Sequence, residues 1–182
     1  LDTSYEPFSK QAEYLDLNRR FVRSWLAQLE SPRLLLDVAC GAGTLTDLLA
    51  HELAEREPTE SVRLVGVDLS RRSLTIARQD LGALGILNGS AGALKAVLVE
   101  GSGCSLRLAD SLADGLMIGN AIHLFPDKPA FMEEVHRVLR PGALFGFNTA
   151  FYEGGRCPES EIFYETWLRH ALRRVKQTPG AR

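Results

Sequence analysis

The sequence has few cysteines, no surplus of basic residues and no long apolar segment, and each shortage argues against a class of protein. Its three cysteines, Cys40, Cys104 and Cys157, are odd in number and lack the spacing of a metal site, so we expect free thiols, no metal and a cytoplasmic location. With 21 Lys and Arg against 23 Asp and Glu, it has no excess positive charge to neutralise phosphates, which argues against a nucleic-acid partner. No apolar run is long enough to cross a bilayer, which argues against integral membrane association.

The remaining composition is that of an ordinary globular domain. A chain of 182 residues, 45% of them hydrophobic, predicts one domain over residues 1–182, large enough for a sheet with helices on both faces. We find no internal repeat and no low-complexity segment, and no pattern that indicates an oligomeric state.

The most informative stretch is residues 34–46, LLLDVACGAGTLT. It begins with an apolar run that carries Asp37 near its end, which is typical of a strand buried on both faces. Gly41 and Gly43 then allow a sharp turn and a close approach of backbone to ligand, and leucines at helical spacing follow. The pattern predicts strand, glycine turn and helix, a unit that binds nucleotides at the carboxyl edge of a parallel sheet.

This turn does not match the dinucleotide-binding fingerprint. That fingerprint requires Gly or Ala at position 46, where this chain has Thr46. Its acidic residue should follow after about 20 residues, whereas the next acid at a predicted strand end, Asp68, lies further along. An NAD-dependent oxidoreductase is therefore the less favoured alternative.

The stretch instead resembles motif I of the class I S-adenosyl-L-methionine (SAM) methyltransferases. Ala39 in place of the first of three glycines is familiar in the branch related to ubiquinone and menaquinone methyltransferases, and RVLRPG at residues 137–142 resembles the superfamily's post-motif. The resemblance covers residues 34–149. It implies an α/β fold with a doubly wound, mostly parallel, Rossmann-like sheet, SAM as cofactor, S-adenosyl-L-homocysteine as product and methyl transfer to a small-molecule acceptor.

The resemblance also implies which residues contact the cofactor. Asp68 ends the predicted strand 62–67, where a carboxylate can accept both ribose hydroxyls, although it could instead only cap the next helix. Ser102 stands where the family often has an aspartate that contacts the adenine, and Asn120 stands where a backbone carbonyl faces the methionyl ammonium. The complete predicted set is Asp37, Ala39, Gly41, Gly43, Asp68, Leu69, Ser102, Gly103 and Asn120.

Fewer signals point to catalytic and substrate residues. His123 follows the predicted strand 114–119, whose loop should face the transferred methyl group, and imidazole titrates near neutral pH, so His123 is the candidate general base. The alternative, which is the more common one for a histidine at this place, is that His123 fills the loop or hydrogen-bonds to the backbone. Phe151 and Tyr152, after the last strand, and Tyr14, near the N-terminus, could line a substrate pocket or only pack internally.

Two helices are expected outside the resembling region. Residues 11–30 predict an N-terminal helix that, in similar methyltransferases, lies over the cofactor as a lid, although it could simply pack on the sheet. Residues 159–176 predict a C-terminal helix. We find no sequence for the antiparallel hairpin that ends the family fold and expect it to be absent. A non-catalytic SAM-fold binding or scaffold protein would share every motif and stays open as the alternative function.

Overall fold

The computed structural model describes residues 10–56, 60–83, 85–87 and 93–149, and six further residues, 162, 166, 167, 169, 170 and 173. The chain divides into two compact units, one of Tyr5–Thr149 and one of Leu1–Ser4 with Ala150–Arg182. The six described residues of the second unit are all helical. The fold and the candidate site belong to the first unit. Among the described residues, no helix combines the length and the apolar character that a membrane span requires.

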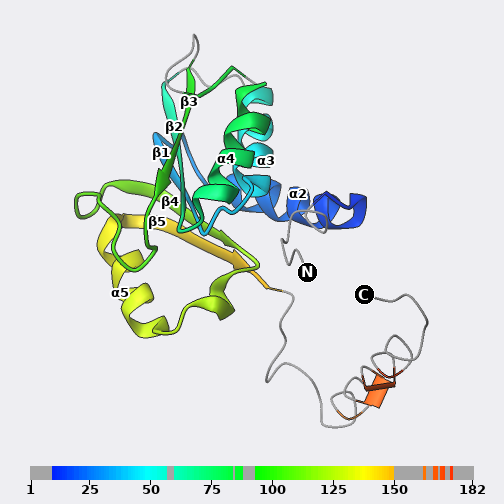
Figure 1. Ribbon diagram of the computed structural model, residues 1–182. Helices are drawn as coiled ribbons and strands as arrows, with labels where there is room; N and C mark the ends of the chain where they lie inside the picture. Colours follow the sequence, from blue (N-terminus) through cyan, green and yellow to red (C-terminus); the bar gives the residue numbers. More distant parts are fainter. Residues whose placement is uncertain are drawn as a thin grey trace. The chain divides into compact units, whose positions relative to one another are not determined.

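A single parallel sheet forms the centre of the larger unit (Figure 1). Its described strands lie in the order β3-β2-β1-β4-β5, and every neighbouring pair runs in parallel, so the described residues contain no antiparallel hairpin. The chain order reverses between β1 and β4, where the strand ends of such a sheet open a crevice for ligands. The strands are β1 (Leu34–Val38), β2 (Val62–Asp68), β3 (Leu94–Glu100), β4 (Ala113–Gly119) and β5 (Leu139–Asn148).

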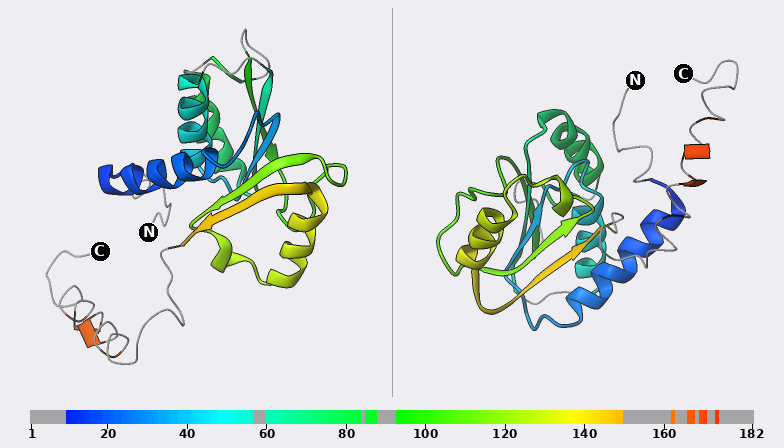
Figure 2. Two further views of the ribbon diagram at one scale, coloured as in Figure 1. Left: turned by 180° about the vertical axis from the view of Figure 1, so that it is seen from behind. Right: turned by 90° about the horizontal axis from the view of Figure 1, so that it is seen from below.

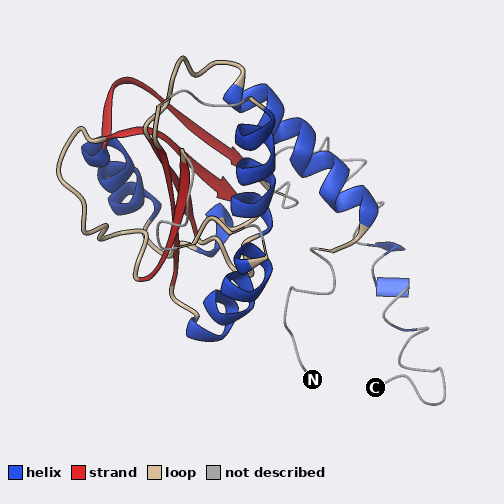
Figure 3. Ribbon diagram, turned by 90° about the horizontal axis from the view of Figure 1, so that it is seen from above, coloured by secondary structure: helices blue, strands red, loops and turns tan. Residues whose placement is uncertain are grey.

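Helices cover both faces of this sheet, as the views from behind, below and above show (Figures 2 and 3). Leu35 of β1 packs in a core with residues of two helices on one face, whereas its neighbour Leu36 packs with Phe131 in the core of the other face. This alternation follows from the two-residue period of a strand and confirms the predicted doubly wound α/β fold. The helices are α2 (Ala12–Leu26), α3 (Thr44–Glu55) and α4 (Arg71–Gly82) on the first face, and α5 (Lys128–Val138) on the second.

The connection from β3 to β4 contains no helix. Residues 101–112 form an irregular loop that crosses to the middle of the sheet, with the side chain of Leu106 buried in the core on the α5 face. Buried backbone groups need hydrogen-bond partners, and a loop cannot supply them by its own regular pattern. Other elements must therefore hold this loop in place.

The passage from α5 into β5 differs from the prediction. The post-motif at residues 137–142, with its Arg-Pro-Gly, is typical of a helix end and a turn that precede a strand from about residue 143. In the structure, β5 instead begins at Leu139, directly after α5. Leu139 pairs with Ala113 and Leu144 pairs with Gly115, so the residues between them bulge out of the strand. Gly142 has φ 82° in this bulge, a conformation that glycine adopts without strain. The post-motif therefore ends the helix as expected, but its turn lies within the strand.

Trp25 fixes the C-terminal half of α2 to the sheet. A Cβ atom on Gly115 or Gly146 would lie 2.5 or 2.7 Å from the indole, so only glycine allows the ring to lie against β4 and β5. Arg23 Nε donates to both carboxylate oxygens of the buried Glu52 at 2.8 Å and ties α2 to α3. This half of the helix packs as an ordinary structural helix, and the lid role stays a prediction.

Candidate functional site

The glycine turn after β1 has the backbone conformation that its sequence predicts. Gly41 and Gly43 have φ values of 55° and 85°, and Ala39 has φ 56°. A Cβ on Gly43 would lie 2.9 Å from Ala77 Cβ, so this glycine allows the start of α3 to contact α4. Apart from the glycine and its two chain neighbours, no described residue has an atom within 4 Å of the Cβ position of Gly41, so this part of the turn borders open space. The first glycine is therefore available to a ligand, and the second serves packing.

Asp37 lies buried beneath this turn, with 2% of its surface exposed. Thr46 Oγ1 donates to Asp37 Oδ2 at 2.6 Å, whereas Oδ1 has no hydrogen-bond partner among the described residues. Burial raises the pKa of Asp37 to about 7, against the opposing effect of the Thr46 hydrogen bond. Thr46 is the residue whose presence argued against the dinucleotide-binding fingerprint. In the structure it donates a hydrogen bond to Asp37, a role that the sequence did not reveal.

Asp68 connects the ends of β1 and β2 through its carboxylate. The backbone N–H of Gly41 donates to Oδ2 at 2.8 Å, and that of Ser70 donates to Oδ1 at 2.7 Å. The N-cap of α4 is Ser70, whose side chain accepts from the Ser73 backbone N–H at 3.2 Å. Helix capping is therefore accomplished without Asp68, and each of its oxygens retains capacity to accept a further hydrogen bond.

A cavity of about 340 Å³ lies at this edge of the sheet. Of the nine predicted cofactor residues, five line it: Ala39, Asp68, Leu69, Ser102 and Gly103. The other four, Asp37, Gly41, Gly43 and Asn120, lie outside its lining. The loops after β1, β2 and β3 and the segment after β4 all contribute, so residues far apart in the sequence meet around one space.

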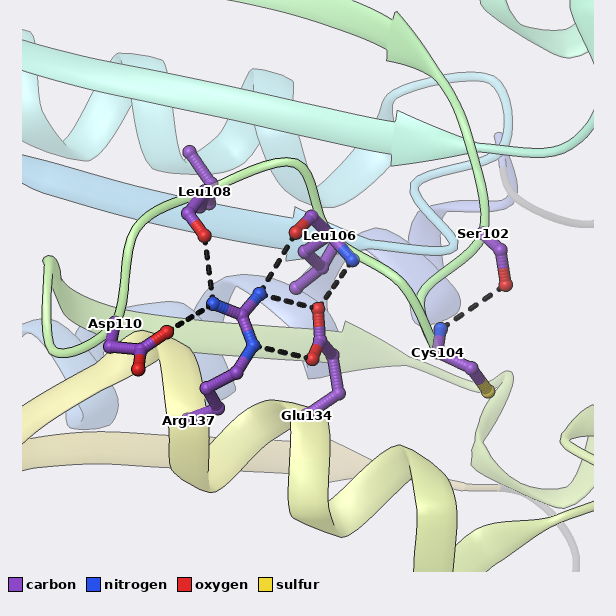
Figure 4. Close-up of polar contacts among 7 residues, drawn as sticks. All are labelled: Ser102, Cys104, Leu106, Leu108, Asp110, Glu134 and Arg137. Carbon is purple, nitrogen blue, oxygen red and sulfur yellow. Dashed lines mark hydrogen bonds and ion pairs between the residues drawn. The ribbon is translucent and has the colours of Figure 1, made fainter.

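The wall that residues 102–104 form is closely packed. Ser102 Oγ accepts a hydrogen bond from the Cys104 backbone N–H at 3.2 Å, which shapes the turn (Figure 4). A Cβ on Gly103 would lie 2.6 Å from Val38 Cγ1 and 2.9 Å from the Phe125 ring, so only glycine allows this approach to β1. Cys104 is half-buried and lines the cavity as part of its wall.

A chain of three asparagines links the site to α2. Asn120 has φ 49°, and its backbone N–H donates to the backbone oxygen and to Oδ1 of Asn148, at 3.0 and 2.9 Å. Asn148 Nδ2 donates in turn to Oδ1 of Asn18, at 2.8 Å, and only 2% of Asn18 is exposed. Sequence reasoning missed Asn18 and Asn148. The available signal was a polar residue at position 18 within the apolar stripe that includes Val22 and Trp25.

The predicted catalytic and substrate residues are less closely tied to the cavity. His123 lies on η1 (Ile122–Leu124), half-buried and outside the cavity lining, and Tyr14 lies half-buried on α2. Phe151 and Tyr152 lie outside the described residues. Their roles stay predictions. Within the described part of the chain, no group of His, Cys, Asp and Glu side chains is arranged to hold a metal ion.

Comparison with known proteins decides the family. The methyltransferase domain family matches residues 36–147, more than half of the chain. The chain belongs to this family. The match runs from within β1 to within β5, so it includes the loops after β1, β2 and β3 and the segment after β4, all of which border the cavity.

Relatives of this methyltransferase domain agree with that assignment. This chain is 31% identical over 131 residues to a demethylmenaquinone methyltransferase of Lactiplantibacillus plantarum, and the match covers 71% of this chain and 51% of that protein. It is 29% identical over 125 residues to a 2-phytyl-1,4-naphtoquinone methyltransferase of Synechococcus elongatus, covering 69% of this chain and 48% of that protein. The chain thus spans about half the length of these curated relatives.

Solved structures show the same fold. A putative SAM-dependent methyltransferase of Methanococcus maripaludis superposes with a TM-score of 0.64 at 14% identity, covering 94% of this chain and 80% of that one. A putative methyltransferase of Bacillus halodurans superposes with a TM-score of 0.54 at 23% identity, covering 74% and 49%. These structures show the fold alone. The family match and the relatives confirm the predicted class I SAM methyltransferase domain, with SAM as its cofactor, and its similarity to the quinone methyltransferases.

Proposed function

We propose that this methyltransferase domain transfers the methyl group of SAM to a small-molecule acceptor by in-line displacement. The observation that carries the proposal is the cavity between Asp68 and residues 102–104, next to the open backbone of Gly41. The two relatives are named for a demethylmenaquinone and a phytyl-naphthoquinone. A naphthoquinone-type acceptor is therefore the first to test.

Three features of the chain suit the parts of the cofactor. Asp68 has acceptor capacity at the cavity wall, which suits the two ribose hydroxyls. Leu69, Ser102 and Gly103 supply apolar surface and backbone groups for the adenine. Asp37, buried with one unpartnered oxygen beneath the turn, suits a cation, such as the ammonium of the methionyl half. Gly41 and Asn120 complete the proposed contacts to this half, and Gly43 contributes through the packing of the turn that presents Gly41.

Methyl transfer from SAM requires few catalytic groups from the protein. When bound, SAM supplies a methyl group that is activated by its positively charged sulfur. The domain holds the acceptor in line with the carbon–sulfur bond and excludes water, and such positioning lowers the barrier by several kcal/mol. We propose that His123, on the segment after β4, accepts the proton of a neutral acceptor hydroxyl. An acceptor that is already anionic requires no base.

We also propose that the protein is cytoplasmic and that it does not act on nucleic acid. Cys40 and Cys104 are both free thiols, and the formal net charge is −2 at pH 7. Both observations support the proposal, because reduced cysteines suit a reducing compartment and a phosphate backbone attracts basic proteins.

Calorimetric titration with S-adenosyl-L-homocysteine and with NAD, followed by methyl-transfer assays on naphthoquinols, phenols and carboxylates, tests the function. We expect binding of S-adenosyl-L-homocysteine, no binding of NAD and labelled product with at least one acceptor. Binding without transfer to any acceptor would favour the non-catalytic alternative. Absence of S-adenosyl-L-homocysteine binding would overturn the cofactor site itself.

A further inference from the structure

Arg137, on the last turn of α5, uses every donor of its guanidinium (Figure 4). Nε and Nη2 donate to the two carboxylate oxygens of Glu134 at 2.8 and 2.7 Å, which is a bidentate pair. The other Nη2 hydrogen bonds the backbone oxygen of Leu106 at 2.9 Å, and Nη1 bonds the backbone oxygen of Leu108 at 2.8 Å and Asp110 Oδ1 at 2.6 Å. Five N–H groups thus meet five acceptors, the full capacity of an arginine.

These contacts hold the loop that connects β3 to β4. Glu134 also accepts from the backbone N–H of Leu106, so both polar backbone groups of this residue bind the pair of α5 side chains. At the far end of the loop, the backbone oxygens of Arg137 and Val138 accept from Ser111 and Leu112 at 2.8 and 2.9 Å. The end of α5 therefore provides the hydrogen bonds that an irregular loop cannot provide for itself.

The Arg137–Glu134 pair is partly buried, which strengthens its hold on the loop. The exposed fraction of the side chain is 33% for Arg137 and 11% for Glu134, and Arg137 lowers the pKa of Glu134, which keeps that carboxylate ionised near neutral pH. A planar, bidentate and partly buried pair positions its partners better than an exposed ion pair does. Lysine at this position would retain the charge but offer three donors in place of five.

The same loop forms one wall of the cavity. Its residues 102–104 line the space, and the Ser105 backbone N–H donates to the Ser102 oxygen at 3.2 Å, which joins this turn directly to Leu106. The segment between the wall and the first contact of Arg137 is thus a single short turn. On this geometry, we expect a displacement of Leu106 to move the wall with it.

We propose that Arg137 is a positioning residue for the adenosine half of the methyl donor, which it serves by fixing the wall at residues 102–104 from α5. The inference rests on the proposed function, because it assigns that wall to the donor. Arg137 itself does not line the cavity. Its effect therefore passes entirely through the backbone of the loop.

Arg140 offers a matched control three residues along the chain. Its Nε lies 2.8 Å from Asp114 Oδ1, and Asp114 Oδ2 accepts from the backbone N–H groups of Arg33 and Leu34 at 2.6 and 2.7 Å. This pair joins β5, β4 and the start of β1, at the edge of the sheet opposite the cavity. Both arginines thus tie a carboxylate and the backbone together, but only Arg137 does so next to the proposed donor site.

The test compares Arg137→Lys with Arg140→Lys in the full chain. For Arg137→Lys, we expect about tenfold weaker binding of S-adenosyl-L-homocysteine and of adenosine alone, and in turnover a raised KM for SAM with little change in kcat, because binding is lost equally in the ground and transition states. For Arg140→Lys, we expect affinities within twofold of wild type, whatever its thermal stability. Equal affinities for the two variants, or a loss in both that follows their loss of stability, would overturn the proposal.

Hydrogen exchange gives a readout that does not depend on ligand. In Arg137→Lys, the amides of Cys104 and Leu106 should exchange faster than in wild type, and in Arg140→Lys the amides of Arg33 and Leu34 should exchange faster.

A second variant keeps the test open if Arg137→Lys does not fold. Asp110→Ala removes one acceptor of Arg137 at an exposed residue and should weaken binding of S-adenosyl-L-homocysteine by two- to threefold. Unchanged affinity in that variant would then count against the proposal. If the wild-type chain does not bind S-adenosyl-L-homocysteine, the proposed function itself is wrong. If the wild type binds and the Arg137 variant binds equally well, only the role of Arg137 is wrong.

Discussion

Two of the segments that border the cavity, here called its first and second walls, are held in place in different ways. At the ends of β1 and β2, the wall consists of short turns whose own backbone conformations and one carboxylate, Asp68, hold it together. At the end of β3, the wall at residues 102–104 belongs to an irregular loop that side chains from α5 hold in place. The first wall is encoded locally, whereas the second depends on an element that is more than thirty residues away in the sequence.

This difference predicts different responses to mutation. Substitutions in the first wall should act directly on ligand binding or on the packing of the turn. Substitutions that affect the second wall should act at a distance, through the loop. The predictions below test that contrast, beginning with the largest expected effect.

Asp68→Asn should weaken binding of S-adenosyl-L-homocysteine about 100-fold, or about 3 kcal/mol, because hydrogen bonds to a charged acceptor contribute about 1.5–3 kcal/mol each. The substitution also places amide hydrogens against the N–H groups of Gly41 or Ser70. Calorimetric titration measures the effect. Glu60→Gln is the matched control, because Glu60 is an exposed carboxylate that pairs with Arg33 at 2.8 Å. The affinity of this variant for S-adenosyl-L-homocysteine should stay within twofold of wild type. Similar affinities for the two variants would contradict the ribose assignment.

Gly43→Ala and Gly41→Ala should separate packing from binding within the first wall. The new Cβ of Gly43→Ala meets Ala77 at 2.9 Å at a positive φ, so the free energy of unfolding should fall by about 2–3 kcal/mol. In Gly41→Ala, the new Cβ meets no atom of a described residue other than its chain neighbours within 4 Å, so only the strain of about 1 kcal/mol applies. Its affinity for S-adenosyl-L-homocysteine should nevertheless fall about tenfold. Chemical denaturation and calorimetry on both variants test this, and equal losses of stability would refute the assignment of the two glycines.

The asparagine chain tests whether long-range support is confined to the wall after β3. Asn18→Ala and Asn148→Ala should each lower the free energy of unfolding, and the double variant should reveal a coupling of about 1 kcal/mol, as expected for one buried hydrogen bond. Because Asn148 holds the backbone of Asn120, its variant should also lower kcat/KM, whereas Asn18→Ala should do so less. Additive effects in denaturation experiments would show that α2 and the segment after β4 are independent.

The pH dependence of Asp37 should give the smallest effect. Because burial raises its pKa to about 7, the folded chain retains a proton that the unfolded chain has already lost above about pH 4. The stability of the ligand-free protein should therefore fall as the pH rises from about 4 through 7. A ligand ammonium favours the ionised carboxyl, so affinity for S-adenosyl-L-homocysteine should rise several-fold between about pH 6 and pH 7.5.

Asp37→Asn provides the control for this prediction. It has nearly the same size but does not titrate, so both pH dependences should flatten. Calorimetry in buffers with different heats of ionisation should detect proton release on binding to the wild type but not to the variant. A wild-type affinity that is constant over this pH range would show that the cation does not bind near Asp37.

Much of the site could be predicted because its signals are local. An apolar run followed by Gly41 and Gly43 predicts a strand and a turn irrespective of the rest of the chain, and Asp68 lies directly at the end of the next strand. Five predicted residues line one cavity because parallel strands bring their carboxyl ends to the same edge.

The missed residues share the opposite property. Asn18, Asn148 and the donors of Arg137 acquire their roles only from partners that lie far away in the sequence. The position of Arg137 in the post-motif indicated the end of a helix, and nothing in that motif names the loop that its side chain binds. The bulge at residues 140–143 was missed because it depends on the register of β5 against β4.

The strand after residue 34 and the glycine turn that follows it could be predicted from neighbouring residues, since periodicity and glycine placement act over a few positions. The class of cofactor followed from the resemblance of this stretch to motif I. Which side chain steadies the wall opposite Asp68, and how α2 is connected to the segment after β4, was decided only when the sheet brought distant segments together. The physical reason is that a buried polar group is satisfied by whatever lies beside it in space, and one-dimensional order does not specify that neighbour.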